Sequence, residues 1–141
     1  SQHYADQFGW PEMVAAVAEV FQKLSPEEQR KCFIYVRNYG QAGAIDFFGE
    51  AYGLPKAACS HNSYWLWGPG DVSTEVGIIF GVSQDVEESL DDLRPYFDSV
   101  ELGAVFTCTY CMPYENNRPI IICRGMKASL QDIWAREKNY N

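Results

Sequence analysis

The stretch Cys32-Phe-Ile-Tyr-Val36, followed by Asn38-Tyr-Gly-Gln-Ala-Gly-Ala-Ile-Asp-Phe-Phe48, decides the fold class of this chain. The first part is a short apolar run rich in β-branched and aromatic residues, which predicts a buried strand. The second part predicts a loop that leads into a helix, which ends near Gly49 or Gly53. A buried strand followed at once by a helix is the repeating unit of an α/β sheet.

The same alternation continues on both sides of this unit. Upstream, apolar residues at helical spacing predict a helix over 12–24, with Pro11 in its first turn. Ser25 then caps a short turn or helix that begins at Pro26. Downstream, the predicted strands are 56–60, 76–82, 100–106 and 119–123, and the predicted helices are 85–97, capped by Ser83, and 129–138.

Strands that alternate with helices of this length predict one α/β domain over residues 1–141. We expect a mostly parallel sheet with helices on both faces, which is a Rossmann-like three-layer arrangement. The long turn from Cys108 to Arg118 leaves open an antiparallel pair of strands at one edge.

The composition is that of a packed, acidic protein, with 47% hydrophobic residues and a formal net charge of -8. Nucleic-acid binding relies on clustered Lys and Arg that neutralise phosphates, and the sequence has no such cluster. Nucleic acid is therefore not an expected partner. The excess of acid also argues against docking on an anionic membrane surface. No apolar run approaches the roughly 20 residues that cross a bilayer.

The chain contains five cysteines, at positions 32, 59, 108, 111 and 123. Cys108-Thr-Tyr-Cys111 has the spacing of a redox site or of half a zinc site. A zinc ribbon needs a second such pair, and a thioredoxin-like motif needs a helix where a turn is predicted here. An isolated structural disulfide or buried thiols are therefore favoured, and no metal site is expected.

Three polar-aromatic loops follow predicted strands, which is where ligands bind in open α/β sheets. The first loop is 38–43, whose backbone N–H groups at a helix start suit an anion or a sugar. It is neither a GxGxxG fingerprint nor a P-loop, and its glycines are also explained by turn formation and close packing.

The second loop, 61–69, places His and Asn beside aromatic rings, as in a carbohydrate platform. Its Trp residues are equally suited to covering the edge of the sheet. The third loop, 110–117, carries Glu115, which would pair with Asp46 or His61 if the loops converge, or which would cap a polar turn. The candidate ligand-binding residues are Asn38, Tyr39, Gln41, Asp46, His61, Asn62, Tyr64, Trp65, Trp67, Tyr114, Glu115 and Asn116.

Several phrases of the sequence occur in an order that resembles one family. They are Phe8-Gly-Trp-Pro-Glu-Met13, Asn38-Tyr-Gly-Gln-Ala-Gly-Ala-Ile-Asp46, Gly53-Leu-Pro55, His61-Asn-Ser-Tyr-Trp-Leu-Trp-Gly68, Met112-Pro-Tyr-Glu-Asn116 and Cys123-Arg-Gly125. Together they resemble the C-terminal region of bacterial glycosyltransferase family 39 proteins. Those proteins are similar to dolichyl-phosphate-mannose–protein mannosyltransferases, which are polytopic membrane enzymes that take a sugar from a polyprenyl-phosphate donor.

The resemblance implies that this chain is the soluble C-terminal part of a membrane hexosyltransferase, on the extracytoplasmic (periplasmic) side. The catalytic carboxylate of that superfamily lies between early membrane helices, so no residue here inherits a catalytic role. The implied role is ligand positioning or scaffolding, with the membrane-embedded part of the parent chain as partner and a polyprenyl-phosphate sugar or glycan acceptor as ligand. No cofactor is implied for this region, and a divalent metal in the parent stays open. An oxidising compartment would permit a disulfide, for which Cys111 and Cys123 are the proposed pair.

Two other functions stay open at this point. The first is a free-standing hydrolase or sugar-modifying enzyme that uses His61 with Asp46 or Glu115, which requires these groups to share one pocket. The second is a structural interaction module, in which the aromatic residues from Tyr64 to Trp67 contact the membrane part.

Overall fold

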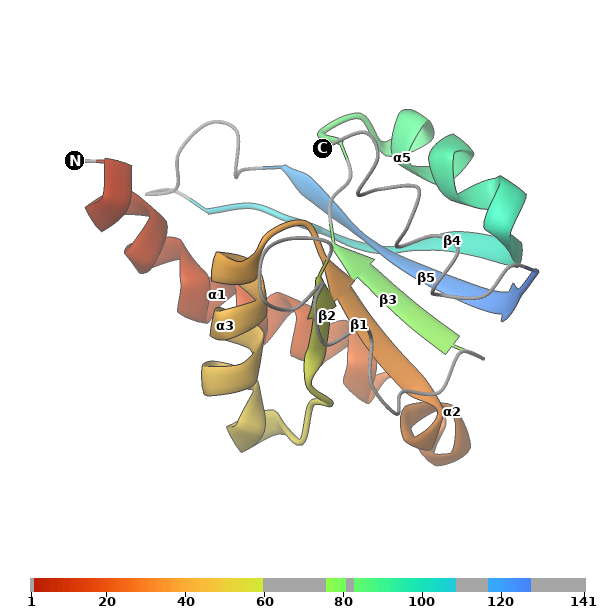
Figure 1. The fold of residues 1–141 in the computed structure, drawn as a ribbon, viewed down its shortest axis with the longest axis horizontal. Coiled ribbons are helices and arrows are strands. Elements are labelled where there is room, and N and C mark those ends of the chain that lie inside the picture. Colours follow the sequence, from red (N-terminus) through yellow and green to blue (C-terminus); the bar gives the residue numbers. More distant parts are fainter. Residues whose placement is uncertain (1, 60–75, 81–82, 109–116, 128–141) are drawn as a thin grey trace.

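A computed structural model of the protein describes residues 2–59, 76–80, 83–108 and 117–127, and for residues 2–8, Tyr39 and Cys59 it describes the backbone alone. Within these residues a single twisted sheet runs through the molecule, in the strand order β2-β1-β3-β5-β4 (Figure 1). The strands are β1 (Cys32–Val36), β2 (Ala57–Cys59), β3 (Val76–Phe80), β4 (Phe97–Phe106) and β5 (Arg118–Met126).

Helices lie on both faces of this sheet, as expected. On one face α1 (Gln2–Gln22) and α3 (Tyr39–Phe48) pack side by side, and the 3-10 turn η1 (Gly49–Tyr52) follows α3 (Figure 1). On the other face α5 (Val86–Leu93) contacts β4 and β5, and the 3-10 turn η2 (Arg94–Tyr96) leads from α5 into β4. The short helix α2 (Pro26–Arg30) connects α1 to β1.

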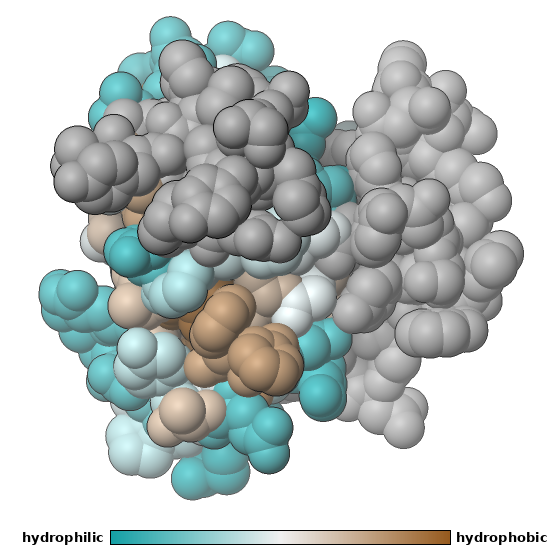
Figure 2. Space-filling view, turned by 90° about the vertical axis from the view of Figure 1, so that its left-hand side faces the viewer, coloured by the Kyte–Doolittle hydropathy of each residue, from teal (hydrophilic) through white to brown (hydrophobic). Residues whose placement is uncertain are grey.

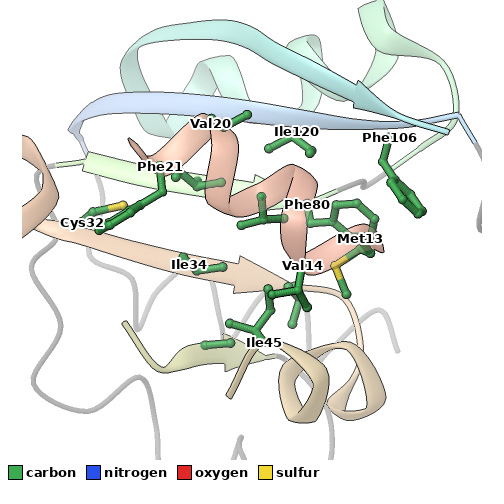
Figure 3. Close-up of a cluster of buried hydrophobic side chains, with 14 of the residues drawn as sticks. Met13, Val14, Val20, Phe21, Cys32, Ile34, Ile45, Phe80, Phe106 and Ile120 are labelled. Carbon is green, nitrogen blue, oxygen red and sulfur yellow. The ribbon is translucent and has the colours of Figure 1, made fainter. Parts of the chain in front are cut away.

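The core is divided into two clusters by the alternation of side chains along each strand. Ile34, Ile78 and Ile120 point toward α1, where they meet Val14 and Val20 of that helix (Figure 3). Their sequence neighbours Phe33, Ile79 and Ile121 point to the opposite face, together with Leu90 and Leu93 of α5. A strand that is buried on both faces reads as a continuous apolar run, which is why 32–36 was recognisable in the sequence.

The prediction of a mostly parallel sheet is wrong. β1 pairs in parallel with β2 and with β3, but β5 is antiparallel to both of its neighbours, β3 and β4. The chain leaves β3 through α5 and continues into β4, and β5 then returns between these two strands. β4 and β5 form an antiparallel pair at the edge of the sheet, which is the alternative that the sequence left open.

Several element boundaries also differ from the expected ones. Pro11 lies inside α1 and not in its first turn, because the helix begins at Gln2. The helix after β3 is capped by Asp85, whose carboxylate accepts a hydrogen bond from the Glu88 N–H at 3.0 Å. It ends at Leu93, so Phe97 belongs to β4 and not to the helix. The predicted helix 129–138 lies outside the described residues.

An ion-pair group ties α2 to the far side of the sheet. Arg124 of β5 donates hydrogen bonds from Nε to Glu28 Oε2 at 2.7 Å and from Nη1 to Glu101 Oε1 at 2.8 Å. The hydrogen bond from Arg124 is the main cause that lowers the pKa of Glu28 below its ordinary value. The same two contacts raise the pKa of Arg124. The group therefore holds together segments that are 96 residues apart.

We expect Glu28→Gln to lower the free energy of unfolding at pH 7 by about 0.5–1 kcal/mol, the range for a partly exposed ion pair. A carboxyl whose pKa is lowered on folding stabilises the protein above its unfolded value of about 4.3 and loses that contribution as the pH falls through the folded pKa. The difference between wild type and variant should therefore vanish at strongly acidic pH. Urea titrations of both proteins at a series of pH values measure it.

The matched control is Glu27→Gln on the same helix, because Glu27 is well exposed and forms its ion pair with Lys31 at 3.4 Å within the same short segment. This change should have a smaller effect and a flatter pH profile. A Glu28→Gln difference that persists unchanged below pH 3 would mean that the ionised pair is not its source.

Candidate functional site

The three parallel strands β1, β2 and β3 all end on the same side of the sheet. We call this row of strand ends the carboxyl edge, as distinct from the outermost strands β2 and β4. Val36, the last residue of β1, pairs with Cys59, the last residue of β2. The first candidate segment, 38–43, was expected to be a loop, which is wrong: only Arg37 and Asn38 separate β1 from α3, and residues 39–43 already belong to the helix. The second candidate segment, 61–69, follows Cys59 and lies outside the described residues. The two segments are therefore attached to the sheet at neighbouring points.

The third candidate loop is attached at the same edge, for a reason that only the strand register shows. Phe106, at the end of β4, pairs with Arg118, at the start of β5. Ile120, two residues further along β5, pairs with Phe80 at the end of β3. Both ends of the segment 107–117 therefore lie at the carboxyl edge, beside the ends of β1 and β3 (Figure 1).

The carboxyl edge contains a topological switch point between β1 and β3. The chain leaves β1 through α3 and reaches β2 on one side, whereas it leaves β3 through α5 and reaches β4 on the other side. In open α/β sheets, ligands bind outside the strand ends at such a point. The amino-terminal ends of α3 and α5 both lie here.

The turn from β1 into α3 is held by two side-chain amides. Asn38 caps α3, because its Oδ1 accepts a hydrogen bond from the Gln41 N–H at 2.8 Å. Gln41 is 5% exposed, and its Oε1 accepts from the Arg37 N–H at 3.0 Å. A Cβ on Gly40 would lie 3.3 Å from Asn38 Oδ1 and 3.5 Å from the ring of Trp10. Glycine thus lets α1, the turn and the cap pack closely.

The start of α5 is held by Ser83, which the sequence predicted as a cap, together with the buried Ser89, which no sequence pattern indicated. The buried Ser89 hydroxyl donates to the Ser83 carbonyl and accepts from the Ser83 N–H, both at 3.1 Å. Ser83 Oγ in turn accepts from the Asp85 N–H at 3.1 Å. The pattern Ser83-Gln-Asp85 before a helix was the available signal, since Ser and Asp both bond to nearby backbone groups.

The two helix starts differ in charge. The first turn of α5 carries Glu87 and Glu88 behind the capping Asp85, whereas the first turn of α3 has no acidic residue and follows Arg37. Negative groups at the start of a helix compete with an incoming anion for the positive end of its dipole. Of these two helix starts, that of α3 is therefore the one compatible with an anionic or hydroxyl-rich ligand.

Asp46, another candidate ligand-binding residue, forms a hydrogen bond that stabilises the fold. Its Oδ1 accepts a hydrogen bond from the Ala57 N–H at 2.9 Å, which fixes the start of β2 against α3. This contact is at the beginning of β2, whereas the His61 loop follows its end. The other candidates, His61, Asn62, Tyr64, Trp65, Trp67, Tyr114, Glu115 and Asn116, lie outside the described residues, as does the side chain of Tyr39.

The expected pairing of Cys111 with Cys123 is wrong, because Cys123 is a free thiol. Its side chain is fully buried in the cluster beneath α5, in the middle of β5. Cys32 is also free and buried, and burial raises the pKa of both thiols to about 12. Neither is a reactive thiolate at neutral pH. Cys108, two residues after β4, is disulfide-bonded.

An exposed aromatic side chain marks the outer face of α3. Phe47 is 76% exposed and stacks edge-on against the Phe48 ring at 4.9 Å between centroids. Tyr52 of η1 is also exposed. Figure 2 shows a small hydrophobic area on this side of the molecule. Single exposed apolar residues are common, so this area assigns no function by itself.

Among the described helices, none is long and apolar enough to span a bilayer. The described His, Cys, Asp and Glu side chains form no group of three or more with metal-binding geometry. Comparison with protein-family models, with curated proteins and with solved structures finds no match for this chain.

Proposed function

We propose that this chain is an accessory, ligand-positioning domain of a membrane glycosyltransferase that draws its sugar from a polyprenyl-phosphate donor. The observation that carries the proposal is the strand register that attaches all three polar-aromatic segments to the carboxyl edge. Segments that are far apart in the sequence are thereby attached to the same edge of the sheet, beside a topological switch point. Their phrases are those that resemble glycosyltransferase family 39 proteins.

The chemistry of the rim is consistent with such a ligand. The start of α3 offers backbone N–H groups without acidic neighbours, which suits a phosphate or sugar hydroxyls. The aromatic residues of the second loop suit the apolar faces of a sugar ring. In this proposal the catalytic groups belong to another part of the parent protein, and the rim holds donor or acceptor in place.

The partner in this proposal is the membrane-embedded part of the same parent chain, on the extracytoplasmic side. A parent coding sequence with several apolar helices upstream of Ser1 would agree with it. A parent coding sequence with none would contradict it.

A ligand titration of the isotope-labelled chain tests the positioning role directly. The ligands are a short-chain polyprenyl phosphate in micelles and a panel of monosaccharides, and backbone amide shifts are followed by NMR. We expect the shifts to gather at the carboxyl edge, around Arg37–Ala42, Ser83 and Asn117. Shifts confined to the opposite edge, around Ser25 and Lys31, or no shifts with any ligand, would contradict the proposal.

Two substitutions, each of which replaces one helix-capping residue by another, make the titration more specific. Asn38→Ser keeps a capping oxygen for α3 and removes the amide NH2 donor at the carboxyl edge. Loss of one neutral hydrogen bond of about 1 kcal/mol weakens binding roughly fivefold. Ser25→Asn is the matched control, because Ser25 caps α2 at the opposite edge by accepting from the Glu28 N–H at 3.1 Å. It should leave the affinity unchanged.

A further inference from the structure

Cys108 is disulfide-bonded, and its partner follows from the positions of the other cysteines. The chain contains five cysteines, of which Cys32 and Cys123 are free. The bond to Cys108 therefore involves either Cys59 or Cys111. A bond to Cys59 would join the two outermost strands of the sheet, whereas a bond to Cys111 would close a short loop within one segment.

The strand order excludes Cys59. This residue ends β2 at one edge of the sheet, and β4, which leads to Cys108, forms the other edge. Four strand spacings of about 4.8 Å separate these edges, roughly 19 Å in all. Cys108 lies two residues beyond Phe106, a reach of at most about 7 Å. A disulfide needs Cα atoms closer than about 7 Å, so the remaining gap is too wide.

We infer that Cys108 is bonded to Cys111, so that the Cys-Thr-Tyr-Cys segment forms a small disulfide ring at the carboxyl edge. The chain leaves β4 at Phe106 and must return to β5 at Arg118, directly opposite. A ring at 108–111 restricts the first part of that return segment.

Cys108 is also the most exposed of the three cysteines whose side chains the structure describes. Cys108 is half-buried, whereas Cys32 and Cys123 are buried with raised pKa values. A small dithiol such as dithiothreitol reduces the bond in two exchanges. One of its thiolates attacks a protein sulfur, which forms a mixed disulfide and releases the first protein thiol. Its second thiol then closes a ring with the first and releases the second protein thiol. The products are two protein thiols and one oxidised dithiol.

Peptide mapping tests the pairing without reference to any ligand. The chain is prepared in a glutathione redox buffer, quenched in acid, denatured, alkylated without reductant and cleaved after glutamate. Cleavage after Glu101 and Glu115 places Cys108 and Cys111 together in the peptide 102–115, apart from the other cysteines. We expect this peptide to carry no alkyl group and to be lighter than its reduced form by the two hydrogen atoms lost on oxidation.

Two serine variants decide between the partners. Cys111→Ser should leave Cys108 without a bond inside its peptide, so that it is recovered alkylated or as a mixed disulfide with glutathione. Cys59→Ser, the matched control, should leave the 102–115 peptide oxidised. Because alkylation follows denaturation, the result does not depend on whether a variant folds. A peptide 102–115 cross-linked to 51–75, which contains Cys59, would overturn the inference. So would alkylation of Cys108 in the unreduced wild-type chain. Failure of the ligand titration would leave this result untouched.

Discussion

Phe80→Ala should lower the free energy of unfolding by about 3–5 kcal/mol, the usual cost of removing a buried phenyl ring. Phe80 ends β3 with 1% of its surface exposed. It lies between α1 and the sheet (Figure 3) and meets the Phe106 ring at 6.1 Å between centroids. Truncation leaves a cavity that rigid strands on both sides cannot fill. Urea denaturation measures the loss as a lower midpoint with an unchanged slope.

Phe47→Ala is the matched control for this loss. It removes the same ring from the outer face of α3, where 76% of the side chain is already exposed. The free energy of unfolding should change by less than about 0.5 kcal/mol. Equal losses in the two variants would show that the Phe80 side of the cluster is not packed as described.

Gly77→Ala should also be strongly destabilising, by about 1–3 kcal/mol, because it overpacks the centre of the sheet. Gly77 of β3 lies opposite Phe33 of β1. An added Cβ would lie 2.8 Å from Phe33 Cε1 and 3.0 Å from Cε2. The Phe33 side chain is fully buried, so its ring has no free space in which to move. Urea or thermal denaturation of the purified variant measures the effect.

Two further proteins test whether the clash with the ring is the cause. Gly43→Ala, on the exposed side of α3 with nothing within 4 Å of the new Cβ, should instead stabilise the chain by about 0.5–1 kcal/mol. In the background Phe33→Leu, Gly77→Ala should cost less than it does alone, since the two changes relieve one contact. Strict additivity of the two changes would contradict the overpacking explanation.

The sequence predicted the local structure well wherever neighbouring residues decide it. The strand Cys32–Val36 lies where the apolar run placed it. The helix Tyr39–Phe48 follows it as expected, but it includes residues 39–43, which were predicted to form a loop. Ser25 caps α2 as expected, and Gly53, with φ of 73°, follows η1. Caps and left-handed glycines depend on contacts within about four residues, so their signals are local.

Boundaries were less predictable where tertiary contacts extend an element. α1 begins well before Pro11, although proline favours a first turn. Its residues Met13, Val17 and Phe21 are buried in the cluster against the sheet. Phe97 belongs to β4, although the sequence pattern predicted it to be the last residue of the preceding helix, because its ring packs beneath α5. Packing overrides the local preference at both positions.

The sequence by itself determined an α/β alternation, the buried strands and which polar-aromatic segments follow them in the chain. Only the tertiary structure decided that β5 inserts between β3 and β4, which makes half of the strand pairs antiparallel. A buried strand is apolar whichever way it runs, so its composition carries no direction. That direction brings the third loop to the carboxyl edge and also separates Cys108 from Cys59 and Cys123. The attachment of these segments at one edge is therefore a property of strand register and not of any motif.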